Sequence, residues 1–239
     1  MNAGLTAPAR RTRQSIWTPL AIVLLFGILL VAAVLSTPPP KPVPYDLNAG
    51  HPRGLLGLRL WLEELGYGVH RIDGLRFAVP DEAALLFVYP NPLAYTEEEA
   101  AALRDWVAAG HTAVIVGPGT EDGALAESFG VRLAGESAFD RTLTQSQPLI
   151  PDGAATYERE WFMPSAVLDL TDAPQAVPVL TIGERGAVAA VQRVGDGTVW
   201  HLAPGVDLTN GGLQETQQGD LLPAILRGIP DGAVVAFDT

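Results

Sequence analysis

The chain has 239 residues, of which 27 are acidic and 15 basic, and it contains no cysteine. Without cysteine, disulfides, thiolate metal ligands and a cysteine nucleophile are excluded. The net charge of −12 at pH 7 argues against nucleic acid as a partner, because phosphate backbones repel an acidic surface. Hydrophobic residues make up 48% of the chain, enough to give one domain of about 200 residues a full core.

An uncharged apolar run covers residues 16–37 and follows Arg10, Arg11 and Arg13. At ~1.5 Å per residue, a helix of this length crosses ~30 Å of hydrocarbon, so we expect one transmembrane helix. The positive-inside rule places the tail, residues 1–15, in the cytoplasm and the rest of the chain outside the cell membrane. A cleaved signal peptide is the alternative, although its apolar core usually has only ~7–15 residues.

Residues 38–44 are rich in proline and predict an extended spacer of the polyproline II type, at ~3.1 Å per residue. They lead into an expected extracytoplasmic domain over residues 45–239. Beyond Lys41, which is the only lysine, 11 basic residues face 27 acidic ones, so this domain is strongly acidic. The richness in alanine and arginine predicts a bacterial source.

A Leu-rich segment predicts a helix over residues 55–65, because its leucines recur at helical spacing and Gly66 follows as a cap. A short strand is expected over residues 69–72. Asn48 and His51 precede the helix. They are typical of caps and turns, or of a polar loop at the mouth of a pocket.

The clearest α/β pattern follows. Two continuous apolar runs, residues 84–90 and 111–117, predict strands that are buried on both faces. Between them, Thr96 and Glu99 form a capping box that opens a helix, and Gly110 ends it. A strand, a helix and a strand with short connections predict a crossover unit in a parallel sheet.

The second half of the domain is expected to be richer in strands. Residues 121–129 predict a short helix, and residues 131–172 show no sustained period, which indicates loops with short strands. The pattern after this point predicts an antiparallel meander and a closing strand. The expected elements are strands at 177–182, 186–194, 198–202 and 233–237, a loop at 210–213 and a helix at 217–226.

Two loops are candidates for a binding site. Gly117 and Gly119 follow a buried strand and precede a helix, where a backbone anion nest or oxyanion hole would lie. Their spacing matches neither a GxGxxG fingerprint nor a P-loop, so a tight turn is the alternative. Asp207 and Asn210 follow the strand at 198–202, and they would face the same loop end as Gly117 if the two strands run parallel.

The remaining polar residues form no recognisable catalytic or metal motif. The four histidines, His51, His70, His111 and His201, show no HExxH or paired spacing, and no serine lies in a GxSxG elbow. We interpret His111 and His201 as residues at strand starts, at the edge of the core. No catalytic residue, metal or cofactor is therefore predicted.

Four segments carry a resemblance to a known family: the Asn48-Ala49-Gly50 turn with the helix WLEELGY, the run LLFVYP, the unit TEEEAAALRDWVAAGHTAVIVGP and the strand VVAFD. They resemble the uncharacterised DUF4350 family. The resemblance implies a membrane-tethered α/β domain that is flavodoxin-like and similar to class I glutamine amidotransferases. Together with the strand pattern, we expect a parallel sheet with helices on both faces and a β-rich C-terminal part.

The same resemblance implies partners and limits the chemistry. Members often accompany MoxR-type AAA ATPases and transglutaminase-like membrane proteins, and they often continue into a second membrane helix. Amidotransferases use a Cys–His–Glu triad, so glutaminase chemistry does not carry over to a chain without cysteine.

We therefore expect a non-catalytic domain that binds a ligand or a protein within a membrane-associated complex. The candidate binding residues are Asn48, His51, Asn91, Gly117, Gly119, Asp207 and Asn210. The alternative is an extracytoplasmic hydrolase of amidotransferase-like fold, which convergence of His51 with an acid and a hydroxyl would favour. A purely structural subunit of an assembly would instead show an exposed apolar patch.

Overall fold

The computed structural model describes residues 17–36, 42–72, 77–78, 81–89, 94–117, 123–135, 142–145, 156–158, 166–182, 186–215 and 217–239. The predicted tail, residues 1–15, and most of the proline-rich spacer lie outside these residues. The chain divides into two compact units, Met1–Pro42 and Val43–Thr239. The first contains helix α1, Trp17–Ser36, whose described side chains, at 20–30, are all exposed. Of the helices in the described parts of the chain, none is long and apolar enough to span a membrane.

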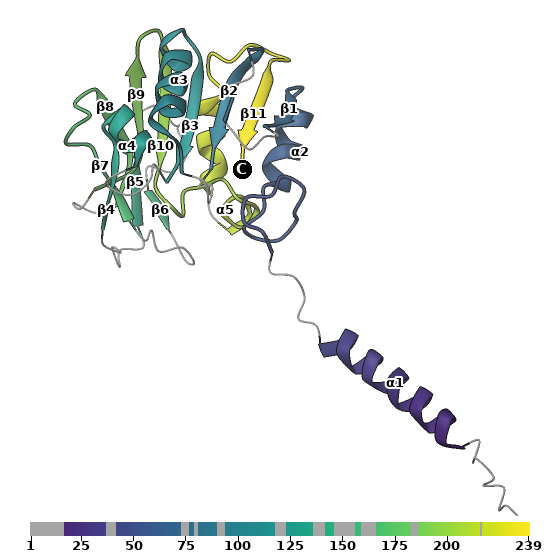
Figure 1. The fold of residues 1–239 in the computed structure, drawn as a ribbon. Helices are drawn as coiled ribbons and strands as arrows, with labels where there is room; N and C mark the ends of the chain where they lie inside the picture. The colour runs from purple at the N-terminus through teal and green to yellow at the C-terminus, as the bar shows by residue number, and fades with distance from the viewer. Residues whose placement is uncertain are drawn as a thin grey trace, which may run out of the picture. The chain divides into compact units, whose positions relative to one another are not determined.

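The second unit is built on one sheet of 11 described strands (Figure 1). The strands are β1 (Gly68–Arg71), β2 (Ala83–Val88), β3 (Thr112–Val116), β4 (Arg132–Gly135), β5 (Thr142–Gln145), β6 (Thr156–Glu158), β7 (Ala166–Asp169), β8 (Ala176–Ile182), β9 (Gly186–Val194), β10 (Gly197–Leu202) and β11 (Val234–Asp238). The helices are α2 (Leu56–Glu64), α3 (Glu97–Ala108), α4 (Ala124–Phe129), α5 (Asn210–Glu215), the 3₁₀ turn η1 (Gln217–Asp220) and α6 (Leu221–Ile225).

The sheet has a parallel half and an antiparallel half. Strands β1, β11, β2, β3 and β10 lie in this order and run parallel. From β10 onward the pairing is antiparallel, through β9 and β8 to β5 and β6, while β7 pairs with β4 and β9. The predicted β2–α3–β3 unit and the β8–β9–β10 meander are therefore confirmed.

The connectivity of the parallel half differs from that of flavodoxin-like proteins. Their strands have the order 2-1-3-4-5. This chain reproduces that order only when β11, its last strand, is counted first. The mixed α/β class is thus confirmed, with the last strand of the chain inserted between β1 and β2.

Helices cover both faces of the parallel half. On β2, Phe87 belongs to the cluster formed with α2 and α6, whereas its neighbours Leu86 and Val88 belong to the cluster formed with α3 and α4. Burying such a side chain stabilises the fold by about 1.5–3 kcal/mol. Because alternate residues face two different cores, the strand reads as an unbroken apolar run.

Two segments differ from the sequence-based expectation, and a third agrees with it. Residues 210–213, predicted as a loop, begin α5. The sequence does not predict this helix because Gly211 and Gly212 have a low helix propensity. The predicted helix at 217–226 is split into η1 and α6. The described parts of residues 131–172 contain four short strands, β4 to β7, in agreement with the predicted short strands, and tertiary pairing holds them without a sequence period.

Candidate functional site

The loops that follow the parallel strands all start at one edge of the sheet, the edge formed by the carboxyl ends of these strands. Gly117 directly follows β3, and its N–H donates to the carbonyl of Leu202, the last residue of β10, over 2.8 Å. Since β3 and β10 run parallel, the Gly117 turn and the loop with Asp207 and Asn210 start at this same edge. Gly117 has a φ of 59°, which glycine adopts without strain, as a tight turn requires.

Asn210 joins two loops at this edge. Its side-chain carbonyl accepts a hydrogen bond from the N–H of Gly57 over 2.7 Å, and its amide nitrogen donates to the carbonyls of Ala49 and His51, both over 2.8 Å. The residue is only 4% exposed. With both polar atoms of its amide bonded to backbone, Asn210 ties residues 49–57 to the start of α5.

Gln218 fixes the other side of the same loop. Its Oε1 accepts hydrogen bonds from the N–H groups of Asp207 and Leu208, over 3.2 and 3.1 Å, and its Nε2 donates to the carbonyl of Gly205 over 2.7 Å. Leu208 has a φ of 54°, a conformation that non-glycine residues rarely adopt. The Gln218 amide therefore holds a backbone turn that is unfavourable by itself.

Asp207 lies between this loop and two tyrosines. Its Oδ1 accepts a hydrogen bond from the Thr209 hydroxyl over 2.9 Å, and its backbone carbonyl accepts one from the Tyr89 hydroxyl over 2.9 Å. Burial raises the pKa of Asp207, and it raises the pKa values of Tyr89 and Tyr45 as well, with the Asp207 charge adding to both. The two tyrosine rings stack with their centroids 4.9 Å apart. Such a group can hold loops in place, or bind a polar partner at its rim.

The other predicted residues take simple roles where they are described. Asn48 is exposed, and its N–H donates to the Asp46 carboxylate over 2.9 Å. His51 Nε2 lies 3.0 Å from the carbonyl of Val43, so its recorded hydrogen bond is with backbone and not with an acid. Asn91 and Gly119 lie outside the described residues. Among the described side chains, no cluster of three or more His, Asp or Glu could hold a metal ion.

A second polar cluster lies at the carboxyl end of β11. The hydroxyl of Tyr95 donates to the carboxylate of Asp238, which is 8% exposed. Burial raises the pKa values of both groups. Glu99 caps α3 through Thr96 and accepts a hydrogen bond from the N–H of Phe77 over 3.1 Å. Sequence reasoning assigned Glu99 to the capping box alone, because its contact with Phe77 depends on tertiary structure.

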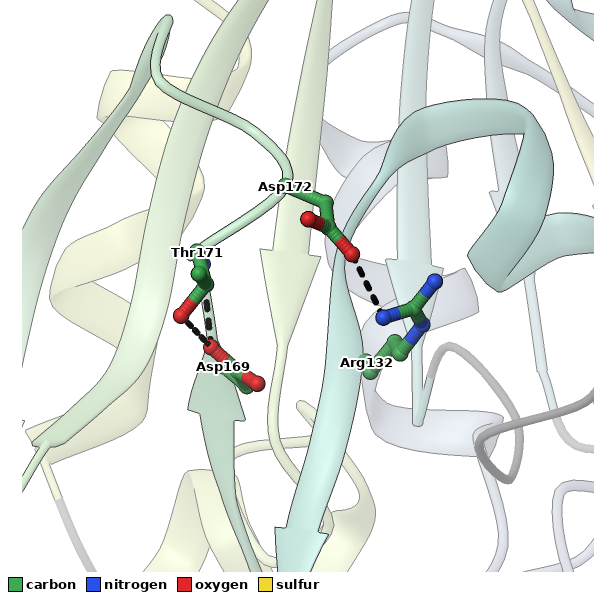
Figure 2. A network of polar contacts seen from close by, with 4 residues as sticks. All are labelled: Arg132, Asp169, Thr171 and Asp172. Carbon is green, nitrogen blue, oxygen red and sulfur yellow. Dashed lines mark hydrogen bonds and ion pairs between the residues drawn. The ribbon is translucent and has the colours of Figure 1, made fainter.

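A shallow hollow of about 390 Å³ lies on the antiparallel half, away from the predicted residues. It is lined by residues of β7, β8 and β9 and of the turn after β7. Two of its lining residues are polar partners: the N–H and the hydroxyl of Thr171 donate to the Asp169 carboxylate over 2.9 and 2.5 Å (Figure 2). These bonds lower the pKa of Asp169. Beside them, Arg132 and Asp172 form an ion pair over 2.5 Å.

His201 is the main polar residue that the sequence-based interpretation misplaced. It is the second-last residue of β10 and is completely buried, so the prediction of a residue at a strand start and at the edge of the core is wrong. Its Nε2 lies 3.0 Å from Oε1 of Gln192 on the neighbouring strand β9. The sequence pattern does indicate that Gln192, the partner of His201, is buried. Gln192 lies in phase with Ala190 and Val194, on a buried face of its strand.

Comparisons with known proteins identify a family but no activity. A family model described as a domain of unknown function, DUF4350, matches residues 50–226. No curated protein matches the chain. Similar solved structures include an exo-beta-1,4-mannosidase from Opitutaceae bacterium strain TAV5 (17% identity, TM-score 0.37, 53% of this chain and 22% of that chain). They also include a beta-galactosidase from Rahnella sp. R3 (14% identity, TM-score 0.39, 60% and 22%). This chain spans about a fifth of the length of these enzymes, and likenesses this low carry no argument about its activity.

Proposed function

This chain belongs to the DUF4350 family, and from this premise we propose that it is a membrane-anchored protein whose extracytoplasmic domain binds a partner without catalysing a reaction. The proposed anchor is the uncharged run of residues 16–37, with the arginine-rich tail in the cytoplasm. The proposed partner is a protein of a membrane complex, either another membrane subunit or a MoxR-type AAA ATPase. The resemblance to amidotransferase-like, flavodoxin-like domains belongs to this proposal too.

One observation carries the choice of binding over catalysis. The polar side chains at the carboxyl edge of the parallel strands bond to backbone and to one another: Asn210 to three backbone groups, Gln218 to three others and Asp207 to Thr209. A nucleophile needs a base within hydrogen-bond reach, and the base must be oriented by a third group. The hydrogen bond of His51 is instead with Val43. These contacts favour a rigid loop over a reactive one.

A rigid loop is well suited to recognition. Residues 48–53 leave Asn48, Gly50, Pro52 and Arg53 exposed, while Asn210 holds the backbone around them. Binding to a preorganised loop avoids the entropic cost of ordering it in the complex. We therefore propose that this exposed loop contributes to the partner-binding surface.

Affinity capture of the full-length protein from its native membrane tests the proposal. The expected result is near-stoichiometric recovery of an AAA ATPase or other membrane subunits, and loss in the variant Arg53→Glu of the membrane subunit that contacts the extracytoplasmic loop. The matched control is Glu64→Arg, which changes the charge of another exposed residue, on α2. Recovery of the protein alone, or equal recovery with Arg53→Glu, would contradict a partner at this loop.

The anchor has its own test, which is independent of the partner. Carbonate extraction of native membranes should leave the full chain in the pellet, and protease added outside should remove residues 45–239 while protecting the tail. Release into the supernatant would overturn the anchor without deciding between binding and catalysis.

A further inference from the structure

We propose that His201 is an acid-sensitive latch, whose protonation releases α4 from the sheet while the rest of the sheet stays folded. The observations are a chain of hydrogen bonds, an unpartnered nitrogen and the short helix that covers them. None of them depends on the proposed binding function.

The hydrogen bonds fix which ring nitrogen of His201 carries the proton. Nε2 of Gln192 donates to the carbonyl of Phe129, the last residue of α4, over 3.0 Å. This bond turns Oε1 of Gln192, an acceptor, toward Nε2 of His201. Since two acceptors cannot bond to each other, His201 carries its proton on Nε2 and leaves Nδ1 as an unprotonated acceptor.

Nδ1 of His201 is buried and has no hydrogen-bond partner among the described residues. A second proton on the ring would therefore create both a charge and an N–H donor in an apolar surrounding, with no acceptor in reach. Burial alone lowers the pKa of His201 to about 3. The ring can take up a proton near neutral pH only in a state that exposes it to water.

Burial is the cause of the lowered pKa of His201, and no charged group around it adds to this effect. The charged side chains on the elements that contact β10 on this side are Glu97, Glu98, Glu99, Arg104 and Asp105 on α3, Glu127 on α4 and Arg193 on β9. None of these contributes to the lowered pKa of His201. Exposure of the ring is thus what restores its ordinary protonation.

The helix that covers His201 is short and depends on tertiary contacts. The ring of Phe129 packs edge-on against that of His201, with centroids 6.0 Å apart. Helix α4 has only six residues, fewer than an isolated helix needs to be stable, so it depends on contacts of this kind. It also contacts α3, through bonds from Arg104 to the carbonyl of Ser128 and from the Ser128 hydroxyl to the carbonyl of Ala100, and its Phe129 belongs to the core that α3 forms with the sheet. Outward movement of α4 would therefore expose His201 and free the Gln192 amide.

Hydrogen exchange of the full chain in neutral detergent micelles tests this latch. The pKa of His201 is about 3 in the closed state, and an exposed histidine in the open state has a pKa near 6.5, so acid favours the open state. From pH 7.5 to pH 5.0, the equilibrium constant for opening of α4 should therefore rise about 30-fold, after correction for the intrinsic exchange rate. The amides of residues 124–130 should show this rise, and those of α2 should not. An unchanged α4, or an equal rise in α2, would overturn the proposal.

A variant separates His201 from the other histidines. His201→Phe should abolish the rise in α4, while the control His70→Asn, on the exposed strand β1, should leave it intact. If His201→Phe does not fold, the wild-type comparison of α4 with α2 still decides. In addition, the NMR signal of the His201 ring in the folded state should show no protonation at pH 5.0, and a shift typical of imidazolium would contradict the latch.

Discussion

Asn210 and His201 are both buried polar residues, yet they differ in how completely their polar atoms are hydrogen-bonded. The amide of Asn210 finds a backbone partner for each polar atom, whereas within the described parts of the chain the ring of His201 has one hydrogen-bond partner, Gln192, and one unpaired nitrogen. The first residue binds two loops into one surface, and its role is independent of pH in the physiological range. The buried position of His201 is stable only while its ring is neutral. The difference shows that the completeness of hydrogen bonding, more than burial, determines what a buried polar group does.

The strongest test of this comparison is Asn210→Ala. The substitution leaves the N–H of Gly57 and the carbonyl of Ala49 without their partner and removes one of the two hydrogen bonds of the His51 carbonyl, so we expect the free energy of unfolding to fall by about 3 kcal/mol. Urea unfolding of the full chain, followed by tryptophan fluorescence, measures it. The control Asn48→Ala removes an exposed amide from the same region and should change stability by less than about 0.5 kcal/mol. Equal effects would mean that the Asn210 contacts do not stabilise the fold.

The next effect concerns His201 and the pH. Its pKa is about 3 in the folded state and 6.5 in the unfolded state, so the unfolded state binds the extra proton, and stability falls as the pH drops below 6.5. Between pH 7.5 and 5.0, wild type should lose about 2 kcal/mol relative to His201→Phe.

The difference between the two proteins is the quantity to measure. Asp207 and Asp238 have raised pKa values, so the folded state binds their protons more readily than the unfolded state. These two acids therefore make the protein more stable on acidification, opposite to the effect of His201. Both proteins contain these acids, so their contribution cancels. Parallel pH profiles for wild type and His201→Phe would show that His201 is not the titrating group.

A smaller effect is expected for Tyr89→Phe. The change removes the hydroxyl that donates to the carbonyl of Asp207, and it should cost about 1 kcal/mol because the stacked ring remains. Tyr67→Phe, at a half-buried tyrosine that packs on the same core, provides the comparison. Thermal unfolding of both variants gives the answer, and a larger loss for Tyr67→Phe would place the important hydroxyl elsewhere.

The smallest effect belongs to a polar contact that is not buried. Thr96→Ala removes the cap of α3 and should cost about 1 kcal/mol or less, because water can replace part of the bond at an exposed helix end. Thr96→Ser keeps the hydroxyl and should restore most of the loss. Chemical denaturation of the two variants distinguishes capping from a general effect of the substitution.

Much of the fold could be predicted because its signals are local. The β2–α3–β3 unit follows from two apolar runs and a capping box, and the meander follows from strands separated by glycine turns. The failures have a common cause. Helix α5 contains two adjacent glycines, and the positions of the short strands β4 to β7, whose presence was predicted, follow no sequence period, so tertiary contacts decide both.

The sequence by itself determined the residue types of this protein: an apolar N-terminal run, an acidic domain, buried strands and polar loop residues at their ends. The tertiary structure alone decided what those polar residues do. It placed β11 between β1 and β2, directed both atoms of the Asn210 amide at backbone groups, and enclosed His201 beneath Phe129. The physical reason is that periodicity reports which face of an element is buried, whereas hydrogen-bond partners come from residues far apart in the chain.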